Sequence, residues 1–496
     1  MVHYIEIAIW RSSYEPQQAS STTEGGERGS TLRAMHHPDG LVLADVEVIG
    51  RGRVDVSVRD GTVVAVGKGG ESGLPTIAGD GHALLPGLHD HHIHVLAAAA
   101  ARGSIKCGPP DVRDGVDLAR RFAAARPHHG WIRGIGYHES VAGDLDTAAL
   151  DRWTPRVPAR VQHRSGALWI VNTAGVRALG LQDAWHAGIE RDVADRPTGR
   201  LWRMDDWLRA RVGADDLPNV TDVSADLARQ GITGVTDATL DLTADAAQAI
   251  VDGGFAQRLI SLGVDAAGSV SLGPRKIVVS DHHLPSYAEL VELVRSARPR
   301  AVALHCATRT SLLLTLAVLG DIGAHRGDRI EHAAVCPPEL ATQAAALGVT
   351  VVTQPSFVRR RGDDYLDDVD AEDIPFLWPF ASLLAEGVRV GCSSDAPFGD
   401  MNPWTSIATA VERRSMAGRE VAAHERVDAW TALRGYLSPP EDPGGRPRTV
   451  HVGAPADLCL LDRPLGDALS APEAVEVRLT CRLGRVLPAH AAAASR

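Results

Sequence analysis

Nucleic-acid and membrane partners are disfavoured by what this sequence contains little of. Aromatic residues make up 4% of its 496 residues, which leaves few side chains that could stack on bases. Acidic residues outnumber basic ones by 62 to 51, and the net charge of −11 argues against binding to nucleic acid through bulk electrostatics. No apolar run reaches the roughly 18–20 residues that span a bilayer. We therefore expect neither nucleic acid nor a membrane as a partner.

Cysteine is also scarce, with six residues that are widely scattered and form no C-x-x-C pair. A long acidic chain with isolated cysteines is typical of a reducing compartment rather than of a disulfide-stabilised secreted protein. The first ten residues contain Glu6 and lack the basic segment and apolar core of a signal peptide. These observations predict a cytoplasmic protein. They leave the oligomeric state open, with a homo-oligomer among the alternatives.

Changes in composition along the chain predict four parts. Residues 1–40 are rich in Ser, Thr, Gly and Glu, which indicates a flexible tail. Short β-rich runs occupy residues 41–85 and return in residues 446–496, where apolar and charged residues alternate. A small β-sandwich domain built from both chain ends would explain this distribution. Residues 86–445 differ from both ends and form the fourth part.

The middle part, residues 86–445, alternates strand and helix signals, most clearly after residue 280. We also expect a charged loop over residues 359–373. Regular alternation of this kind favours an α/β fold, and we predict a (β/α)8 TIM barrel. The 182 residues between His94 and Lys276 exceed the roughly 120 that three βα units need, which predicts an insertion near residues 150–210. Its tryptophans could line a pocket or form a small core of their own: Trp153, Trp169, Trp185, Trp202 and Trp207.

Histidine, by contrast, is plentiful at 21 residues, and the strongest local pattern is the segment from Pro86 to His94. On a strand, residues two apart face the same way, so His92 and His94 can approach one metal ion with Asp90 on the same side. Neutral imidazole is a common ligand for zinc and related ions. A packed or solvated histidine cluster is the alternative explanation for an H-x-H pattern on its own.

Four further polar residues stand beside β-rich apolar runs: Lys276, His305, His332 and Asp395. Read singly, each has an ordinary structural role available, as an ion-paired lysine, hydrogen-bonded core histidines, or a loop carboxylate. In a (β/α)8 barrel, however, the carboxyl ends of the strands converge on one site. Their joint occurrence at strand positions therefore favours a shared site with the H-x-H pair.

Taken together, these patterns resemble the amidohydrolase superfamily, and more narrowly the subgroup that contains the N-substituted formamide deformylases. The resemblance extends from about Leu41 to Val486. Its signature strand corresponds to Pro86–His94. The remaining motifs that match are Trp131–Gly134, Val171–Asn172, Gly231–Asp237, Arg329–His332, Gln354–Pro355 and Ser394–Pro397.

The resemblance implies a centre of divalent metal, with zinc as the first choice. His92 and His94 would hold the more buried ion, and His305 with His332 would hold the other. Lys276 would be carboxylated on its amine and bridge the two, since a carbamate is an oxygen donor and an ammonium is not. Two ions are expected if Lys276 is carboxylated, and one otherwise. Asp395 would touch metal and the attacking water and act as the catalytic proton shuttle.

The function that follows is a metal-dependent hydrolase of non-peptide carbon–nitrogen bonds with a small-molecule amide-type substrate, first of all linear amides or formamides. Hydrolysis of cyclic amides, deamination of a heterocycle and hydrolysis of esters or lactones are the enzymatic alternatives. A non-catalytic barrel is a further alternative, because Ala167, Thr308 and Arg309 depart from the family pattern. Asp90 and Glu331 are candidates to orient the metal-binding histidines.

Overall fold

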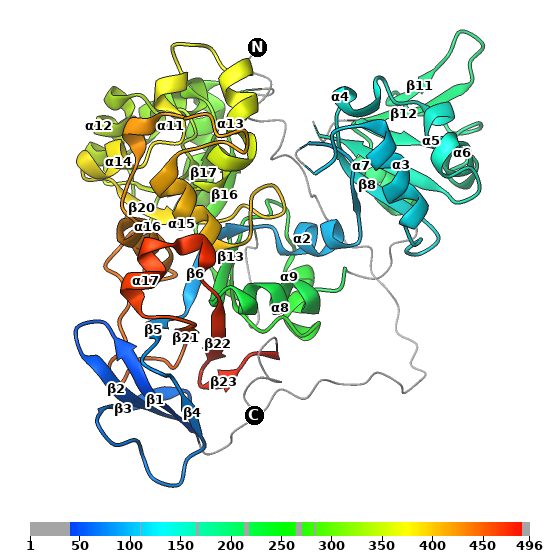
Figure 1. Ribbon diagram of the computed structural model, residues 1–496. Coiled ribbons are helices and arrows are strands. Elements are labelled where there is room, and N and C mark those ends of the chain that lie inside the picture. The colour runs from blue at the N-terminus through cyan, green and yellow to red at the C-terminus, as the bar shows by residue number, and fades with distance from the viewer. Residues whose placement is uncertain are drawn as a thin grey trace. The chain divides into compact units, whose positions relative to one another are not determined.

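The computed structural model describes residues 40–109, 111–164, 168–212, 218–263, 270–281 and 284–488. Apart from Gly40, the predicted tail lies outside the described residues. Internal contacts divide the chain into two compact units, of which the larger contains the described residues up to Val95 and from Val220 onwards. The smaller contains those between Leu96 and Asn219. Figure 1 labels the helices and strands of both units.

Two parallel sheets form the centre of the larger unit. One has the strand order β15-β14-β13-β6, and the other has the order β16-β17-β18-β19-β20. Most of these strands are buried and apolar, which is typical of parallel sheets covered on both faces. Their bounds are β6 Leu88–Ile93, β13 Ile232–Asp237, β14 Arg258–Ser261, β15 Ser271–Leu272, β16 Arg275–Val278, β17 Val302–Cys306, β18 Arg329–His332, β19 Thr350–Thr353 and β20 Arg389–Cys392.

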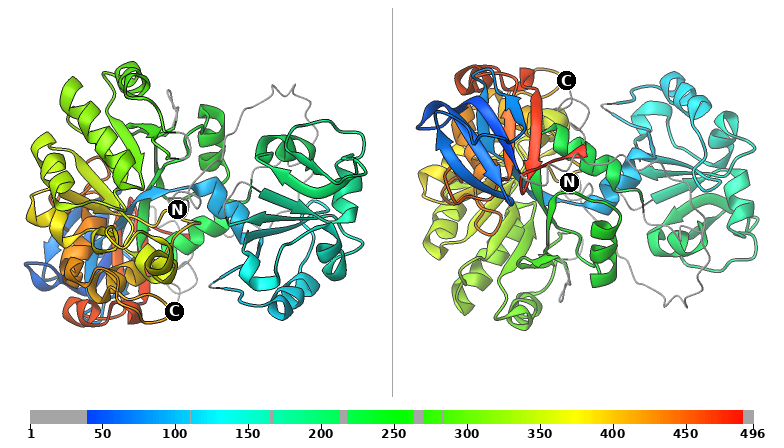
Figure 2. Two further views of the ribbon diagram at one scale, coloured as in Figure 1. Left: turned by 90° about the horizontal axis from the view of Figure 1, so that it is seen from above. Right: turned by 90° about the horizontal axis from the view of Figure 1, so that it is seen from below.

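Helices follow most of these strands and lie outside them (Figure 2). Local sequence explains where several begin: Ser286 and Glu289 form a capping box at the start of α10, and Thr308 caps α11. The helices of this unit are α8 Thr221–Arg229, α9 Ala244–Asp252, α10 Tyr287–Ala297, α11 Arg309–Ile322, α12 Pro338–Leu347, α13 Ser356–Asp368, η1 Ile374–Phe376, α14 Ala381–Ala385, α15 Pro403–Glu412, η2 Ala423–Glu425, α16 Ala429–Leu437, α17 Leu465–Ser470 and η3 Pro472–Ala474.

The strand pairing shows a mixed α/β fold with parallel sheets, but it does not confirm a closed (β/α)8 barrel. Backbone hydrogen bonds do connect the two sheets at both edges. Asp395 N donates to His92 O at 2.8 Å, and Lys276 N donates to Leu262 O at 3.0 Å. These are isolated bonds near strand ends rather than continuous ladders, so the described strands remain two sheets.

The predicted loop over residues 359–373 is wrong for most of its length, because α13 spans Ser356–Asp368. Its many charges suggested a solvated loop, yet its buried residues recur at helical spacing. Phe357, Val358 and Tyr365 are buried on one face while the charged residues occupy the other. The sequence therefore contains the amphipathic period of a helix, but its many charged residues favoured the prediction of a loop.

Strands from both chain ends share one eight-stranded mixed sheet rather than the two sheets of a sandwich. β5 pairs in parallel with β1 and antiparallel with β21, and it thereby joins the two ends of the chain. The predicted sandwich is not shown. The strands are β1 Leu41–Val48, β2 Gly52–Arg59, β3 Thr62–Gly67, β4 Thr76–Ala78, β5 Ala83–Pro86, β21 Leu458–Leu461, β22 Val477–Arg482 and β23 Arg485–Val486.

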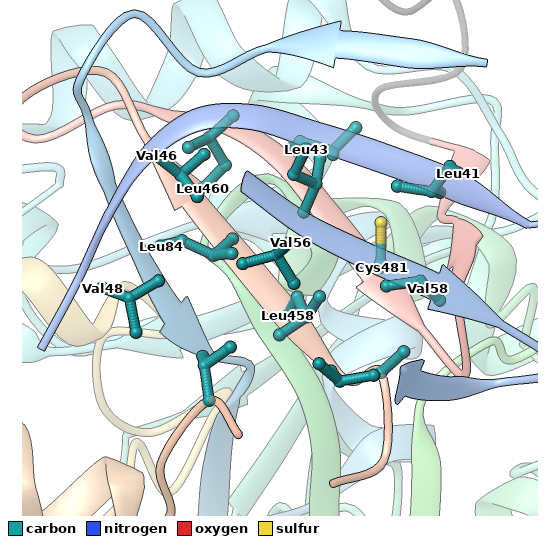
Figure 3. Close-up of a cluster of buried hydrophobic side chains, with 14 of the residues drawn as sticks. Leu41, Leu43, Val46, Val48, Val56, Val58, Leu84, Leu458, Leu460 and Cys481 are labelled. Atoms are coloured by element: carbon teal, nitrogen blue, oxygen red, sulfur yellow. The ribbon is translucent and has the colours of Figure 1, made fainter. Parts of the chain in front are cut away.

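A hydrophobic cluster underlies this sheet, and Leu84 lies in it at the junction of the two chain ends (Figure 3). Leu84 is opposite Val48 on β1 and opposite Leu460 on β21. We expect Leu84→Ala to lower the free energy of unfolding by about 2–5 kcal/mol, because it removes a buried side chain and leaves a cavity. Val64→Ala on β3, where the side chain is 39% exposed, should change it by less than about 0.5 kcal/mol. Chemical denaturation of both variants measures this, and equal losses would contradict the packing described.

The smaller unit has its own six-stranded sheet with the order β11-β12-β10-β9-β8-β7. It begins well before the insertion predicted near residues 150–210, because β8 pairs with β9 and β7 pairs with β8. Its elements are α2 Val95–Arg102 at the boundary, β7 Ile105–Lys106, α3 Gly115–Ala124, β8 Ile132–Tyr137, α4 Glu139–Ala142, α5 Thr147–Trp153, β9 Ala159–His163, β10 Leu168–Val171, α6 Thr173–Ala178, β11 Ile189–Arg191, β12 Pro197–Trp202 and α7 Asp205–Val212.

The tryptophans of the smaller unit divide between its core and its surface. Trp169 is buried in a core cluster against which Trp207 packs, and Trp153 packs on a second cluster. Trp185 and Trp202 are exposed. Core packing therefore accounts for three of the five tryptophans in the predicted insertion.

Among the described residues, no helix has the length and apolarity needed to cross a bilayer. All six cysteines are buried, and none of them forms a disulfide bond. The cytoplasmic location stays a prediction.

Candidate metal centre

Strand β6 presents two pairs of histidines to opposite sides. His92 and the following His94 face the carboxyl ends of the other parallel strands, and their ring centroids are 5.5 Å apart. His89 and His91 point away from that group, and their Nε2 atoms lie 2.9 Å from the hydroxyls of Thr236 and Ser438. This separation follows from the two-residue period of a strand.

The structure brings all six predicted site residues together in the larger unit. Lys276 comes from β16, His305 from β17, His332 from the end of β18, and Asp395 follows β20. Lys276 Nζ lies 3.3 Å from His92 Nε2. The ring of His332 is 4.9 Å from that of His92 and 4.6 Å from that of His305. Asp395 Oδ1 lies 3.6 Å from His92 Nε2 and 3.4 Å from His94 Nε2.

These side chains fit a divalent cation. One atom each of His92, His332 and Asp395 lies within 4.8 Å of the others, and all three side chains are buried. His94 Nε2, His332 Nε2 and both carboxylate oxygens of Asp395 form no hydrogen bond with the described residues. Leaving such atoms buried and unpaired is costly. Imidazole nitrogen and carboxylate oxygen are zinc ligands, so a bound ion would satisfy them.

The Nδ1 atoms of three site histidines are held by other side chains, which directs their Nε2 atoms toward the centre. His92 Nδ1 contacts the carboxylate of Glu331. His332 Nδ1 lies 2.8 Å from Gln354 Oε1, and His94 Nδ1 lies 3.2 Å from the hydroxyl of Thr239. Partners of this kind fix the orientation of metal-binding imidazoles. Glu331 was among the candidates for this role, whereas the roles of Thr239 and Gln354 were not predicted.

Asp90 is not directed at the centre but at the loop that carries Asp395. It accepts hydrogen bonds from Ser394 N at 3.0 Å, from His92 N at 3.1 Å and from the Ser394 hydroxyl. Asp395 has a φ of 52° and His332 a φ of 74°, in the left-handed region that non-glycine residues rarely adopt. Such strain persists only where surrounding bonds over-determine it, and the Asp90–Ser394 contacts supply them for Asp395.

Burial and neighbouring charges shift the pKa values of the side chains in the centre. Burial, followed by the charge of Lys276, lowers the pKa of His92 well below its usual value, and burial also lowers the pKa of His305 and His332. Burial lowers the pKa of Lys276 to about 8. For Asp395, burial acts to raise the pKa, but the close contact with His94 Nε2 and the other nearby histidines outweigh it and lower the pKa to about 2. The site thus favours an ionised Asp395 and neutral imidazoles at His92, His305 and His332.

The positions that depart from the family pattern have structural roles where they are described. Thr308 caps α11, and its hydroxyl oxygen accepts a hydrogen bond from Ser311 N at 3.1 Å. Arg309 forms an ion pair with Asp373. Ala167 lies outside the described residues.

A sequence profile of the amidohydrolase family matches residues 76–488. This match covers most of the chain, and the protein therefore belongs to the amidohydrolase family. The resemblance noted in the sequence is thus confirmed. The protein is a metal-dependent hydrolase that acts on carbon–nitrogen bonds other than peptide bonds.

Relatives agree with this assignment at modest identity. N-substituted formamide deformylase of Arthrobacter pascens is 26% identical over 460 residues, which cover 77% of this chain and 84% of that protein. A metal-dependent hydrolase from Pyrococcus horikoshii has a TM-score of 0.66 at 16% identity and matches 86% of this chain and 98% of its own. One from Pyrococcus furiosus has a TM-score of 0.63 at 18% identity over 86% and 99% of the two chains. The two structures share the fold with this protein.

Proposed function

We propose that this enzyme hydrolyses linear amides of small molecules, with N-substituted formamides as the first substrate class. The observation that carries the proposal is the convergence of four histidines, Lys276 and Asp395 in one buried centre whose free ligand atoms fit a divalent ion. The choice of formamides is supported by the similarity to a formamide deformylase along most of both chains. The products would be formate and an amine.

The metal would be zinc, with His92, His94, His305, His332 and Asp395 as ligands. We further propose that Lys276 is carboxylated on Nζ and holds two ions as a shared ligand. Its burial supports this, because a lowered pKa leaves more of the amine neutral, and only the neutral amine can react with carbon dioxide. Without carboxylation, the remaining ligands would hold one ion.

Asp395 and the histidines would have different roles in the proposed hydrolysis. A divalent ion bound here would polarise the substrate carbonyl and lower the pKa of a water molecule. Asp395, held ionised and in a fixed backbone conformation, would accept the proton of the attacking water at a carboxylate oxygen. It would then deliver that proton to the nitrogen of the amine as the carbon–nitrogen bond breaks. The histidines would serve as ligands.

We also propose that the two parallel sheets form one distorted (β/α)8 barrel. Support comes from the backbone hydrogen bonds at both sheet edges. This arrangement would place the six site residues on or directly after strands of one barrel, and barrel enzymes carry their active sites at the carboxyl ends of such strands.

The substrate class is tested with a panel of N-substituted formamides, the matching acetamides, cyclic amides, and formate esters or lactones of similar size. We expect formamides to be hydrolysed with equal release of formate and amine, and with the highest kcat/KM of the panel. Preparations of an Asp395→Asn variant, purified in parallel, measure contaminating activity. Turnover of esters or lactones without turnover of any amide would overturn the proposal.

A further inference from the structure

A buried pair of charged residues, Glu331 and Arg329, lies behind His92 and contacts it at Nδ1 rather than at Nε2, the nitrogen that faces the centre. Glu331 Oε2 contacts His92 Nδ1, and Glu331 Oε1 accepts a hydrogen bond from Arg329 Nε. A second guanidinium nitrogen of Arg329 donates to the backbone carbonyl of His91 at 3.1 Å. Arg329 is 2% exposed, and both Glu331 and His92 are 0% exposed. Both residues of this pair lie on β18 and contact β6: Glu331 contacts the side chain of His92, and Arg329 contacts the backbone of His91.

The other two oriented histidines have neutral partners. Gln354 Oε1 faces His332 Nδ1, and its amide nitrogen donates to the Ser393 hydroxyl at 2.9 Å, which fixes the amide's orientation. Thr239 offers His94 a hydroxyl. The centre therefore has one histidine backed by a carboxylate, one by an amide and one by a hydroxyl.

A carboxylate behind an imidazole has two effects that a neutral partner produces more weakly. It fixes the tautomer with the proton on Nδ1, and it raises the electron density, and hence the basicity, of Nε2 as a ligand. Burying an unpaired carboxylate would be costly, and the guanidinium of Arg329 offsets that cost. The pair is therefore neutral overall while its negative end is directed at His92.

We propose that Glu331 and Arg329 are positioning residues that make His92 the strongest anchor of the metal centre, so that the ion held by His92 binds more tightly than the ion held by His305 and His332. The proposal rests on the metal centre of the proposed function. It adds an order of affinity within that centre, and it assigns Arg329 a part in metal binding.

The test measures metal affinity of the full-length protein without turnover. Metal-free wild-type protein and Glu331→Gln are titrated with zinc against a competing chelator, and with cobalt while its visible absorption is recorded. We expect Glu331→Gln to weaken the tighter ion about 10–100-fold and to change the cobalt spectrum. Arg329→Lys, which keeps the charge but cannot make both contacts of Arg329, should weaken it less.

Asp328 provides a matched control. It is also a fully buried carboxylate, and it pairs with Arg298 through two hydrogen bonds of 2.7 Å without contacting a site histidine. Asp328→Asn should lower thermal stability but leave the affinity of the tighter ion within about twofold. Thr239→Val should weaken metal binding less than Glu331→Gln, because it removes only a neutral partner.

The proposal is overturned if Glu331→Gln binds the first ion as tightly as the wild type, or if Asp328→Asn or Thr239→Val weakens that ion equally. These outcomes are distinct from failure of the proposed function. A protein that binds zinc as expected but hydrolyses no amide would overturn the substrate assignment and leave the order of affinity supported. An active amidase with unchanged affinity in Glu331→Gln would overturn the order alone.

Discussion

Replacement of Asp395 by asparagine is expected to lower kcat for a hydrolysed formamide by about 10²–10⁴-fold, because the amide cannot accept the proton of the attacking water. The effect should fall on kcat more than on KM, since Asp395 acts in the chemical step. It should persist across the pH range of the wild-type enzyme, because Asp395 is ionised at any pH well above about 2. Steady-state kinetics with metal content measured on the same samples checks this.

Asp367→Asn is the control for the loss of one carboxylate. Asp367 lies on α13 and forms an exposed ion pair with Arg419 at 2.7 Å, an arrangement that contributes little to stability. Its replacement should leave kcat unchanged. If Asp395→Asn retained a kcat within tenfold of the wild type at full metal content, the proton shuttle would have to be another group.

Lys276→Met should reduce the metal content from about two ions per chain to one or none and lower kcat/KM by about 100-fold or more. Methionine is similar in size to lysine but cannot form a carbamate, so the shared ligand would be lost. Elemental analysis of the purified variant measures the metal content. About one ion per wild-type chain would instead indicate a mononuclear centre without the carbamate.

The chain offers an unusually clean background for this experiment, because it contains only three lysines: Lys68, Lys106 and Lys276. Lys68 is exposed directly after β3, and Lys68→Met should change neither metal content nor activity. Protein prepared with ¹³C-bicarbonate should show a carbamate carbon signal that Lys276→Met removes and Lys68→Met retains. A signal that survives in Lys276→Met would exclude Lys276 as its source.

Local patterns in the sequence were enough to find the residues of the centre. The two-residue period of a strand placed His92 and His94 on one side, and the strand–helix alternation placed Lys276, His305, His332 and Asp395 on or beside strands. Family membership is confirmed as well. The roles of these residues as metal ligands stay predictions.

Local sequence patterns could not identify the side chains that contact the Nδ1 atoms of the site histidines. Gln354 supports a histidine 22 positions earlier, and Glu331 supports one 239 positions earlier. Such contacts depend on which strands become neighbours, and no local period encodes them. The closed barrel and the sandwich, which the strand pairing does not show, likewise rest on long-range pairing rather than on the type of each element.

The position of β5 has a consequence for how this protein is made in the cell. β5 leads almost directly into β6 with its H-x-H pair, yet it pairs with β21, whose residues 458–461 are synthesised long after β5. A growing chain carries His92 and His94 long before Asp395 and β21 leave the ribosome. Contacts so distant in sequence form slowly and leave earlier segments exposed. Completion of the metal centre therefore waits for Asp395, and a product truncated before β21 would leave β5, the strand that leads into His92 and His94, without one of its two partners.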